Sequence, residues 1–220
     1  MSQVTSSAKP HRCDAPPNPT LDGSAVSVFG CLVKEHSSLY CAIPITSGIR
    51  LWHLAKETGV KNLDEVKTKA PRRFASEVLE PNIADGTRFV KAARKLSCLA
   101  IDPSRLTMPS WTQEQYAAFW EMVIAKWVRA IVLSPNWIFS KGCVTECIFA
   151  LNGSIKILDL NGAQVSRKRL FSMLEKAQRT RDELSIDAPF LDSLAKVLNG
   201  QAIPNRIHSP SIVKVGAGEG

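Results

Sequence analysis

The stretch that decides the fold runs from Val128 to Asp159 and reads VRAIVLSPNWIFSKGCVTECIFALNGSIKILD. It opens with a continuous apolar run at 130–133, which is typical of a strand that is buried on both faces. The run breaks at Ser134, and a second apolar segment at 154–158 has the composition of another strand. The stretch therefore predicts a strand, a loop, a helix and a second strand.

The helix between these strands has clear start and stop signals. Ser140 can act as its N-cap, the apolar pattern continues to about Leu151, and Gly153 follows just past the end. In open parallel sheets such units bind ligands at the carboxyl ends of the strands, beside helix N-termini. Ser140, Gly142 and Glu146 lie at that end of the predicted unit.

Strands and helices alternate along the rest of the chain. This alternation predicts an α/β fold, a three-layer Rossmann-like sandwich around a parallel sheet of about five strands. An N-terminal extension and C-terminal helices are expected outside that core, and the segment between Gly59 and Ile83 is expected to be irregular because Pro71 and Pro81 interrupt it. Further strands are expected at 25–33 (an extra edge strand), 39–44 and 98–101, and helices at 49–57, 85–96, 111–127 (with Thr112 as N-cap and Gln115 completing a capping box), 166–179 and 188–198.

Length and composition favour one domain. A chain of 220 residues with 45% hydrophobic content can bury a sizeable core, which we place at 25–204, between a flexible arm at 1–24 and a flexible tail at 205–220. No apolar run approaches the ~20 residues that cross a bilayer, and the polar start lacks a secretory signal, so a cytoplasmic protein without a membrane partner is expected. The six cysteines show no C-x-x-C spacing. We therefore expect no disulfide, no zinc or other metal, and no cofactor.

The net charge of +8 suits an anionic ligand, although charge alone leaves nucleotide, nucleic acid and solubility open. Nucleic acid is the least favoured of the three. A basic cluster at 67–73 is more often a solvated surface than a phosphate site. The residues of that cluster are Lys67, Lys69, Arg72 and Arg73, and those of the basic C-terminal helix are Arg167, Lys168, Arg169, Lys176, Arg179 and Arg181.

A hydroxyl-rich loop follows the strand at 39–44. Pro44, Ile45, Thr46, Ser47 and Gly48 connect that strand to the helix at 49–57. A short loop of this kind, between a first strand and a helix, can place backbone N–H groups on a phosphate. The signal is weak when it stands alone.

Glu146 is the candidate for chemistry. It lies on a helix whose other side chains are nearly all apolar or small, so its carboxylate is expected to be partly desolvated, which raises its basicity. Gly142 and Ala150, one turn before and after, leave room for a substrate. The alternative is an ordinary surface glutamate, and spacing does not decide between the two. Ser140 is likewise either a simple N-cap or a cap that also donates to a phosphate.

Two segments resemble the nucleoside 2-deoxyribosyltransferase-like superfamily. The first is YCAIPITSG at 40–48, which resembles its first strand and ligand loop. The second is WIFSKGCVTECIFALNG at 137–153, in which Ser140, Gly142, Glu146, Ala150 and Gly153 match the family's second signature. The form with a tryptophan ahead of the serine, here Trp137, looks most like an uncharacterised branch common in phages and bacteria. The resemblance spans residues 39 to 158.

The resemblance implies cleavage of an N-glycosidic bond, with Glu146 attacking C1′ of a 2-deoxyribose while the base departs. Serine in place of aspartate at Ser140 is typical of the members that hydrolyse 5′-monophosphates. A second carboxylate, which orients or protonates the base, is matched by Glu121, although the family usually has aspartate there. The substrate-binding residues would be the loop from Pro44 to Gly48 together with Trp137, Ser140 and Gly142. Family members commonly assemble as dimers or larger homo-oligomers.

The chain also departs from the family pattern. Ala42 and Ile43 precede Pro44 where the family often has a glycine, and the tyrosines that some transferases use for the base have no clear counterpart. The alternative function is therefore a nucleotide-binding or sensing module without turnover, in which the same loops hold a nucleotide. Hydrolysis and transfer, and the identity of the base, stay open.

Overall fold

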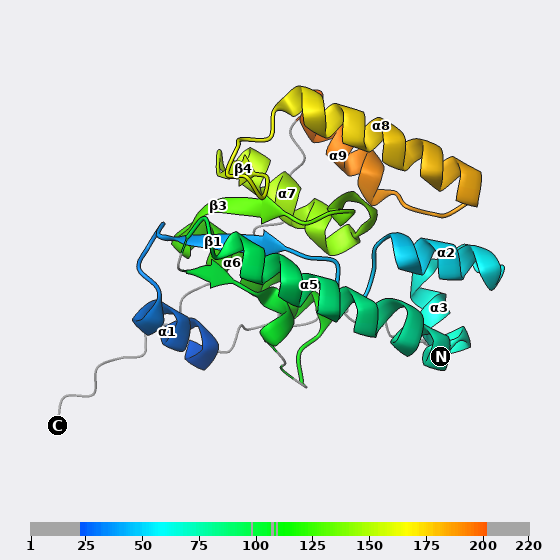
Figure 1. The fold of residues 1–220 in the computed structure, drawn as a ribbon, viewed down its shortest axis with the longest axis horizontal. Coiled ribbons are helices and arrows are strands. Elements are labelled where there is room, and N and C mark those ends of the chain that lie inside the picture. Colours follow the sequence, from blue (N-terminus) through cyan, green and yellow to red (C-terminus); the bar gives the residue numbers. More distant parts are fainter. Residues whose placement is uncertain (1–22, 98, 107, 109, 202–220) are drawn as a thin grey trace, which may run out of the picture.

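The computed structural model describes residues 23–97, 99–106, 108 and 110–201. Its centre is a four-stranded sheet in the order β2-β1-β3-β4, with every pair of neighbouring strands parallel (Figure 1). The α/β prediction is confirmed for this part of the chain, with four strands instead of about five. The strands are β1 (Ser38–Ala42), β2 (Ala100–Ile101), β3 (Val128–Leu133) and β4 (Lys156–Leu158).

Helices connect the strands and extend beyond them. The helix α7 lies between β3 and β4, as the central stretch predicts. Two further helices follow β4; the second of them packs against α7, and the first packs against the second (Figure 1). The helices are α1 (Gly23–Leu32), α2 (Ile49–Glu57), α3 (Leu63–Lys69), α4 (Pro71–Arg73), the π-helical η1 (Phe74–Leu79), α5 (Glu80–Ala93), the 3₁₀ turns η2 (Pro103–Arg105) and η3 (Trp137–Phe139), α6 (Gln113–Trp127), α7 (Lys141–Asn152), α8 (Arg167–Leu184) and α9 (Phe190–Leu198).

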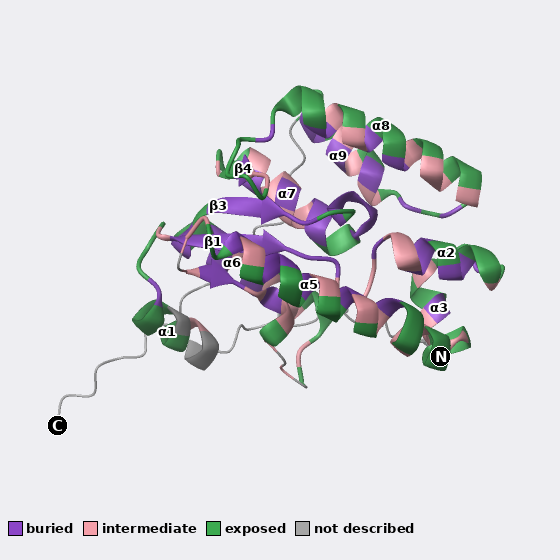
Figure 2. Cartoon of the chain, in the orientation of Figure 1, coloured by how far each residue is buried: buried purple, intermediate pink, exposed green. Residues whose placement is uncertain are grey.

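The two faces of the sheet are covered by different helices. Side chains alternate along β1, so Leu39 and Cys41 pack with α5, whereas Tyr40 and Ala42 pack into the larger core with α6 and α7. Both β1 and β3 are buried almost throughout (Figure 2). Because the chain moves outward in opposite directions from β1 and β3, the carboxyl ends of these two strands form the topological switch point, where such folds bind ligands.

A register shift in β3 keeps its apolar side chains in the core. Val128 pairs with Ser38 and Ala130 pairs with Leu39, which leaves Arg129 as an extra, exposed residue. An extra residue in one strand reverses the inward and outward alternation locally. Val128 and Ile131 therefore both enter the larger core, although they are three positions apart.

The prediction of an edge strand at 25–33 is wrong, because most of this segment forms the helix α1. A short apolar run does not by itself distinguish a strand from a helix. Here tertiary packing decides: Val26 packs against the larger core, Val33 is buried, and a Cβ at Gly30 would lie 3.5 Å from Trp127.

The segment expected to be irregular between Gly59 and Ile83 is mostly helical. Pro71 occupies the first turn of α4, where its missing N–H is harmless. Pro81 lies inside the continuous helical run from α4 to α5 and cannot donate to the preceding turn. The π-helical segment η1 directly before it accommodates this, since the N–H of Glu80 bonds to the carbonyl of Ala75, five residues back.

The predicted helix starts are confirmed at two caps. Thr112 and Gln115 form the capping box of α6, and Ser140 accepts from the N–H of Cys143 at the start of α7. Residues 1–22 of the expected arm and all of the tail at 205–220 lie outside the described residues. Within the described part, no helix is long and apolar enough to cross a bilayer.

The packing of β3 yields a stability prediction. Ile131 is fully buried at the centre of the sheet, so Ile131→Ala should lower the free energy of unfolding by about 2–5 kcal/mol. Arg129→Ala on the same strand should change it by less than about 0.5 kcal/mol. Urea denaturation of both variants checks this, and similar losses for the two would contradict the arrangement of β3.

Candidate functional site

Glu146 is held by a tyrosine from the neighbouring strand. The hydroxyl of Tyr40, on β1, donates to Oε1 of Glu146 at 2.6 Å. Tyr40 is itself fully buried, and its ring lies edge-on to Trp120 of α6 with 5.5 Å between centroids. The other carboxylate oxygen, Oε2, is buried and has no hydrogen-bond partner among the described residues. One oxygen is thus fixed, and the other carries no hydrogen bond within the described residues.

The surroundings of this carboxyl group favour its neutral form. Removal from water raises the pKa of Glu146 to about 8, and the hydrogen bond from Tyr40 offsets only part of the increase. Burial, reinforced by the adjacent glutamate, raises the pKa of Tyr40 well above its usual value, so the phenol stays a neutral donor. Burial also raises the pKa of the neighbouring thiols of Cys143 and Cys147. Although its carboxyl group is buried, Glu146 as a whole residue keeps partial exposure.

Two serine hydroxyls meet at the start of α7. Ser47 Oγ, from the loop after β1, lies 2.8 Å from Ser140 Oγ, and Ser140 also accepts from the N–H of Cys143. Only one of the two hydroxyl protons is used in the bond between them, so the pair retains a proton for an acceptor. Lys141 and Gly142, which open the helix, are exposed. An N-terminus of this kind favours an anion.

The loop after β1 is clamped by Asn82 of α5, which sequence reasoning missed. The buried Asn82 amide donates to the carbonyls of Ile45 and Ser47 at 3.0 and 2.8 Å, and its oxygen accepts from Arg50 at 2.8 Å. Gly48 ends the loop with a φ of 97°, and a Cβ there would lie 3.0 Å from that of Pro44. The loop is therefore held in one conformation.

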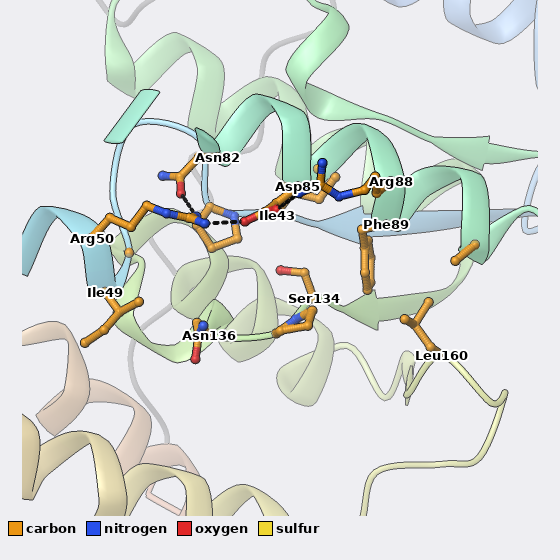
Figure 3. A pocket seen from close by; sticks show the side chains of 15 residues that line it. Ile43, Ile49, Arg50, Asn82, Asp85, Arg88, Phe89, Ser134, Asn136 and Leu160 are labelled. Atoms are coloured by element: carbon orange, nitrogen blue, oxygen red, sulfur yellow. Dashed lines mark hydrogen bonds and ion pairs between the residues drawn. The ribbon is translucent and has the colours of Figure 1, made fainter. Parts of the chain in front are cut away.

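A pocket of about 380 Å³ lies at the switch point (Figure 3). Of the predicted binding loop, Pro44 and Gly48 line it, whereas Glu146, Ser140 and Ser47 do not. The pocket lies on the α5 side, which receives the side chain of Ile43, and Glu146 lies with Tyr40 on the other side of β1. Other lining residues include Arg50, Asp85, Arg88, Phe89, Ser134 and Leu160.

Glu121, Trp137 and Thr46 are the remaining predicted site residues, and none of them lines the pocket. Glu121 on α6 is half-buried, which raises its pKa, and it follows Trp120, the ring that contacts Tyr40. It makes no hydrogen bond with Glu146. Trp137 is fully buried in the larger core, and its indole N–H has no partner in the described part of the chain. Thr46 is partly exposed on the loop.

The basic clusters are largely engaged by the protein itself. Lys67, Lys69 and Arg73 form ion pairs on the surface, as expected for a solvated cluster. On α8, Arg169 and Arg181 pair with Asp159 and Asp192, and Arg167 donates to the carbonyls of Val197 and Leu198. Among the described residues, no group of three His, Cys, Asp or Glu could hold a metal ion.

No family model, no curated protein and no solved structure matches the chain. The assignment of a function therefore depends on the chemistry of the site. On one side of β1 lie a desolvated carboxyl group fixed through one oxygen by Tyr40 and a serine pair at a helix N-terminus, and on the other side lies the pocket at the switch point.

Proposed function

We propose that the chain cleaves the N-glycosidic bond of a 2′-deoxynucleoside 5′-monophosphate, with Glu146 as the nucleophile. The observation that carries the proposal is the state of its carboxyl group, which is fixed by Tyr40 through Oε1 and has a buried, unpartnered Oε2. A carboxylate with one oxygen oriented and the other free of competing hydrogen bonds is suited to attack carbon.

The reaction has two steps. The ionised Glu146 oxygen bonds to C1′ as the bond from C1′ to the base nitrogen breaks, and the base leaves with the electron pair and takes up a proton. Water then attacks C1′ of the glycosyl ester, releases the sugar phosphate and a proton, and restores the carboxylate. If a second base replaces water, the same intermediate leads to base exchange.

The phosphate is held at the N-terminus of α7. The spare proton of the Ser47 and Ser140 pair and the exposed start of the helix both favour an anion. An aspartate at position 140 would repel a phosphate, whereas the hydroxyl of Ser140 can donate a hydrogen bond to it. Glu146 follows Ser140 by six positions on the same helix, so the anion and the carboxylate act from one rigid element.

Glu121 is the proposed proton donor to the leaving base. Its half-buried position raises its pKa, which increases the fraction that carries a proton near neutral pH. The chain places it directly after Trp120, whose ring packs on Tyr40. In this role Glu121 acts on the base, while Glu146 acts on the sugar.

One observation favours a second candidate function, a nucleotide-binding module without turnover. The pocket at the switch point is lined by neither Glu146 nor Tyr40. A nucleotide confined to that pocket would lie on the α5 side of β1 and would emerge unchanged. Whether bound nucleotide is cleaved therefore separates the two functions.

The nucleophile assignment predicts that Glu146→Gln stops release of free base from deoxynucleoside monophosphates, because the amide cannot form the glycosyl ester. Chromatography of the released base over a panel of four nucleotides measures this. Glu175→Gln, which changes an exposed carboxylate on α8, should leave the rate unchanged. Base release that persists at the wild-type rate in Glu146→Gln would refute the assignment.

The raised pKa predicts two pH dependences. Since only the ionised form of Glu146 attacks, kcat/KM of the Glu121→Gln variant, in which the second acid no longer titrates, should rise with pH through about 8. Between about 4.5 and 8 the folded chain holds a proton that the unfolded chain has released, so the free energy of unfolding should fall as pH rises, by at most about 1.4 kcal/mol per pH unit. Denaturation of the wild type and Glu146→Gln across this range measures the difference, and parallel curves would contradict it.

The phosphate assignment predicts that Ser140→Asp raises KM for a monophosphate at least about tenfold, with little effect on the corresponding deoxynucleoside. Aspartate is also a good N-cap, so α7 should be retained. Ser166→Asp makes the same change at the cap of α8 and should leave both KM values unaltered. Equal effects of Ser140→Asp on the two substrates would exclude phosphate binding at this helix.

A further inference from the structure

The pocket at the switch point is not used by the proposed reaction. Its volume of about 380 Å³ lies at the lower end of the range for small-molecule sites. Its walls come from the segments after β1, β3 and β4, from the start of α2 and from α5 (Figure 3). The clamp by Asn82 keeps the β1 loop in place, so the pocket is preformed.

Ser134 supplies an unsatisfied hydrogen-bonding group to this pocket. The residue is only 5% exposed, and its hydroxyl oxygen is buried without a partner in the described structure. Its backbone is satisfied, since the N–H donates to Ala42 and the carbonyl accepts from Trp137. In Figure 3 the hydroxyl is turned toward the interior of the pocket. A buried hydroxyl without a hydrogen-bond partner is energetically unfavourable, and a polar group of a ligand can supply the missing hydrogen bond.

The polar wall of the pocket carries an excess positive charge. Asp85 is shared by two guanidinium groups, those of Arg50 at 2.6 Å and of Arg88. Arg50 also donates a hydrogen bond to the side-chain oxygen of Asn82. Arg88 is mostly exposed and uses only one of its nitrogens for Asp85, so it retains N–H donors for an incoming anion.

Apolar side chains also line the pocket. Ile43 and Phe89 contribute buried hydrophobic side chains, and Leu160 at the edge is 37% exposed. Gly86 lets α5 approach closely, because a Cβ there would lie 2.8 Å from a methyl group of Ile43. A flat, apolar molecule would cover these surfaces.

We infer that this pocket is a second ligand site, which binds a small organic anion with a flat ring body and one carboxylate-like group. The ring lies against Ile43, Phe89 and Leu160, one oxygen of the carboxylate-like group is bound by Arg88, and the other accepts from the hydroxyl of Ser134. One anionic charge matches the excess of one cation over Asp85. The site goes beyond the proposed cleavage reaction and does not require Glu146.

Naphthoate tests the inference, because it has the ring and the charge but no glycosidic bond. Calorimetry with the full chain should give one site with a Kd below about 1 mM, and neutral naphthamide should bind at least about tenfold more weakly. Arg88→Gln should weaken naphthoate about tenfold, and Ala92→Phe, which fills the pocket from α5, should abolish binding. Lys91→Gln removes an exposed charge from the same helix, and Glu146→Gln alters the proposed nucleophile; both should leave binding unchanged.

Ser134→Ala separates a ligand contact from a structural role. Since the hydroxyl has no partner, its removal should not lower the unfolding temperature, but it should weaken naphthoate binding several-fold. The inference is overturned if naphthoate does not bind, if naphthamide binds equally well, or if Arg88→Gln, which leaves the fold intact because the side chain is exposed, has no effect. Loss of binding in Glu146→Gln would also overturn it, because naphthoate would then bind on the Glu146 side of β1 and not in this pocket.

Discussion

The hydrogen bond from Tyr40 to Glu146 is the interaction on which the functional account depends. It joins a fully buried side chain of the first strand to a helix more than a hundred residues later, at a separation of 106 positions. Burial alone would favour a protonated, freely rotating carboxyl group. The phenol restrains one oxygen and leaves the other unpartnered, at the cost of a buried acid whose pKa is raised to about 8. Groups with such perturbed titration are concentrated at functional sites.

The fold places two different chemical environments on either side of β1. The side chain of Tyr40 packs toward α6 and α7, where the Glu146 carboxyl group lies. The side chain of Ile43 packs toward α5, where the pocket lies. The loop after β1 connects them. Asn82 of α5 holds this loop through its carbonyls, and Ser47 in the loop contacts the Ser140 cap of α7. The two sides therefore share one loop.

The sequence was most informative where local signals were strong. The strand, cap and helix of the central stretch, including Ser140, and the capping box at Thr112 are confirmed because each depends on neighbouring residues. The helix at 23–32 and the helical run around η1 were missed, since packing and a proline decide them. Tyr40 and Asn82 were not found as site residues because their partners are distant in sequence. The desolvation of Glu146, in contrast, was one of the two alternatives that the apolar helix around it left open.

The most direct measurement is a crystal structure of Glu146→Gln with a bound deoxynucleoside monophosphate. The account predicts the phosphate at the Ser140 end of α7 and C1′ within about 3–3.5 Å of the position of Oε2, the separation of a near-attack geometry. A nucleotide that instead occupies the pocket on the α5 side, with C1′ separated from residue 146 by β1, would contradict a nucleophilic role for Glu146 and would support binding without turnover.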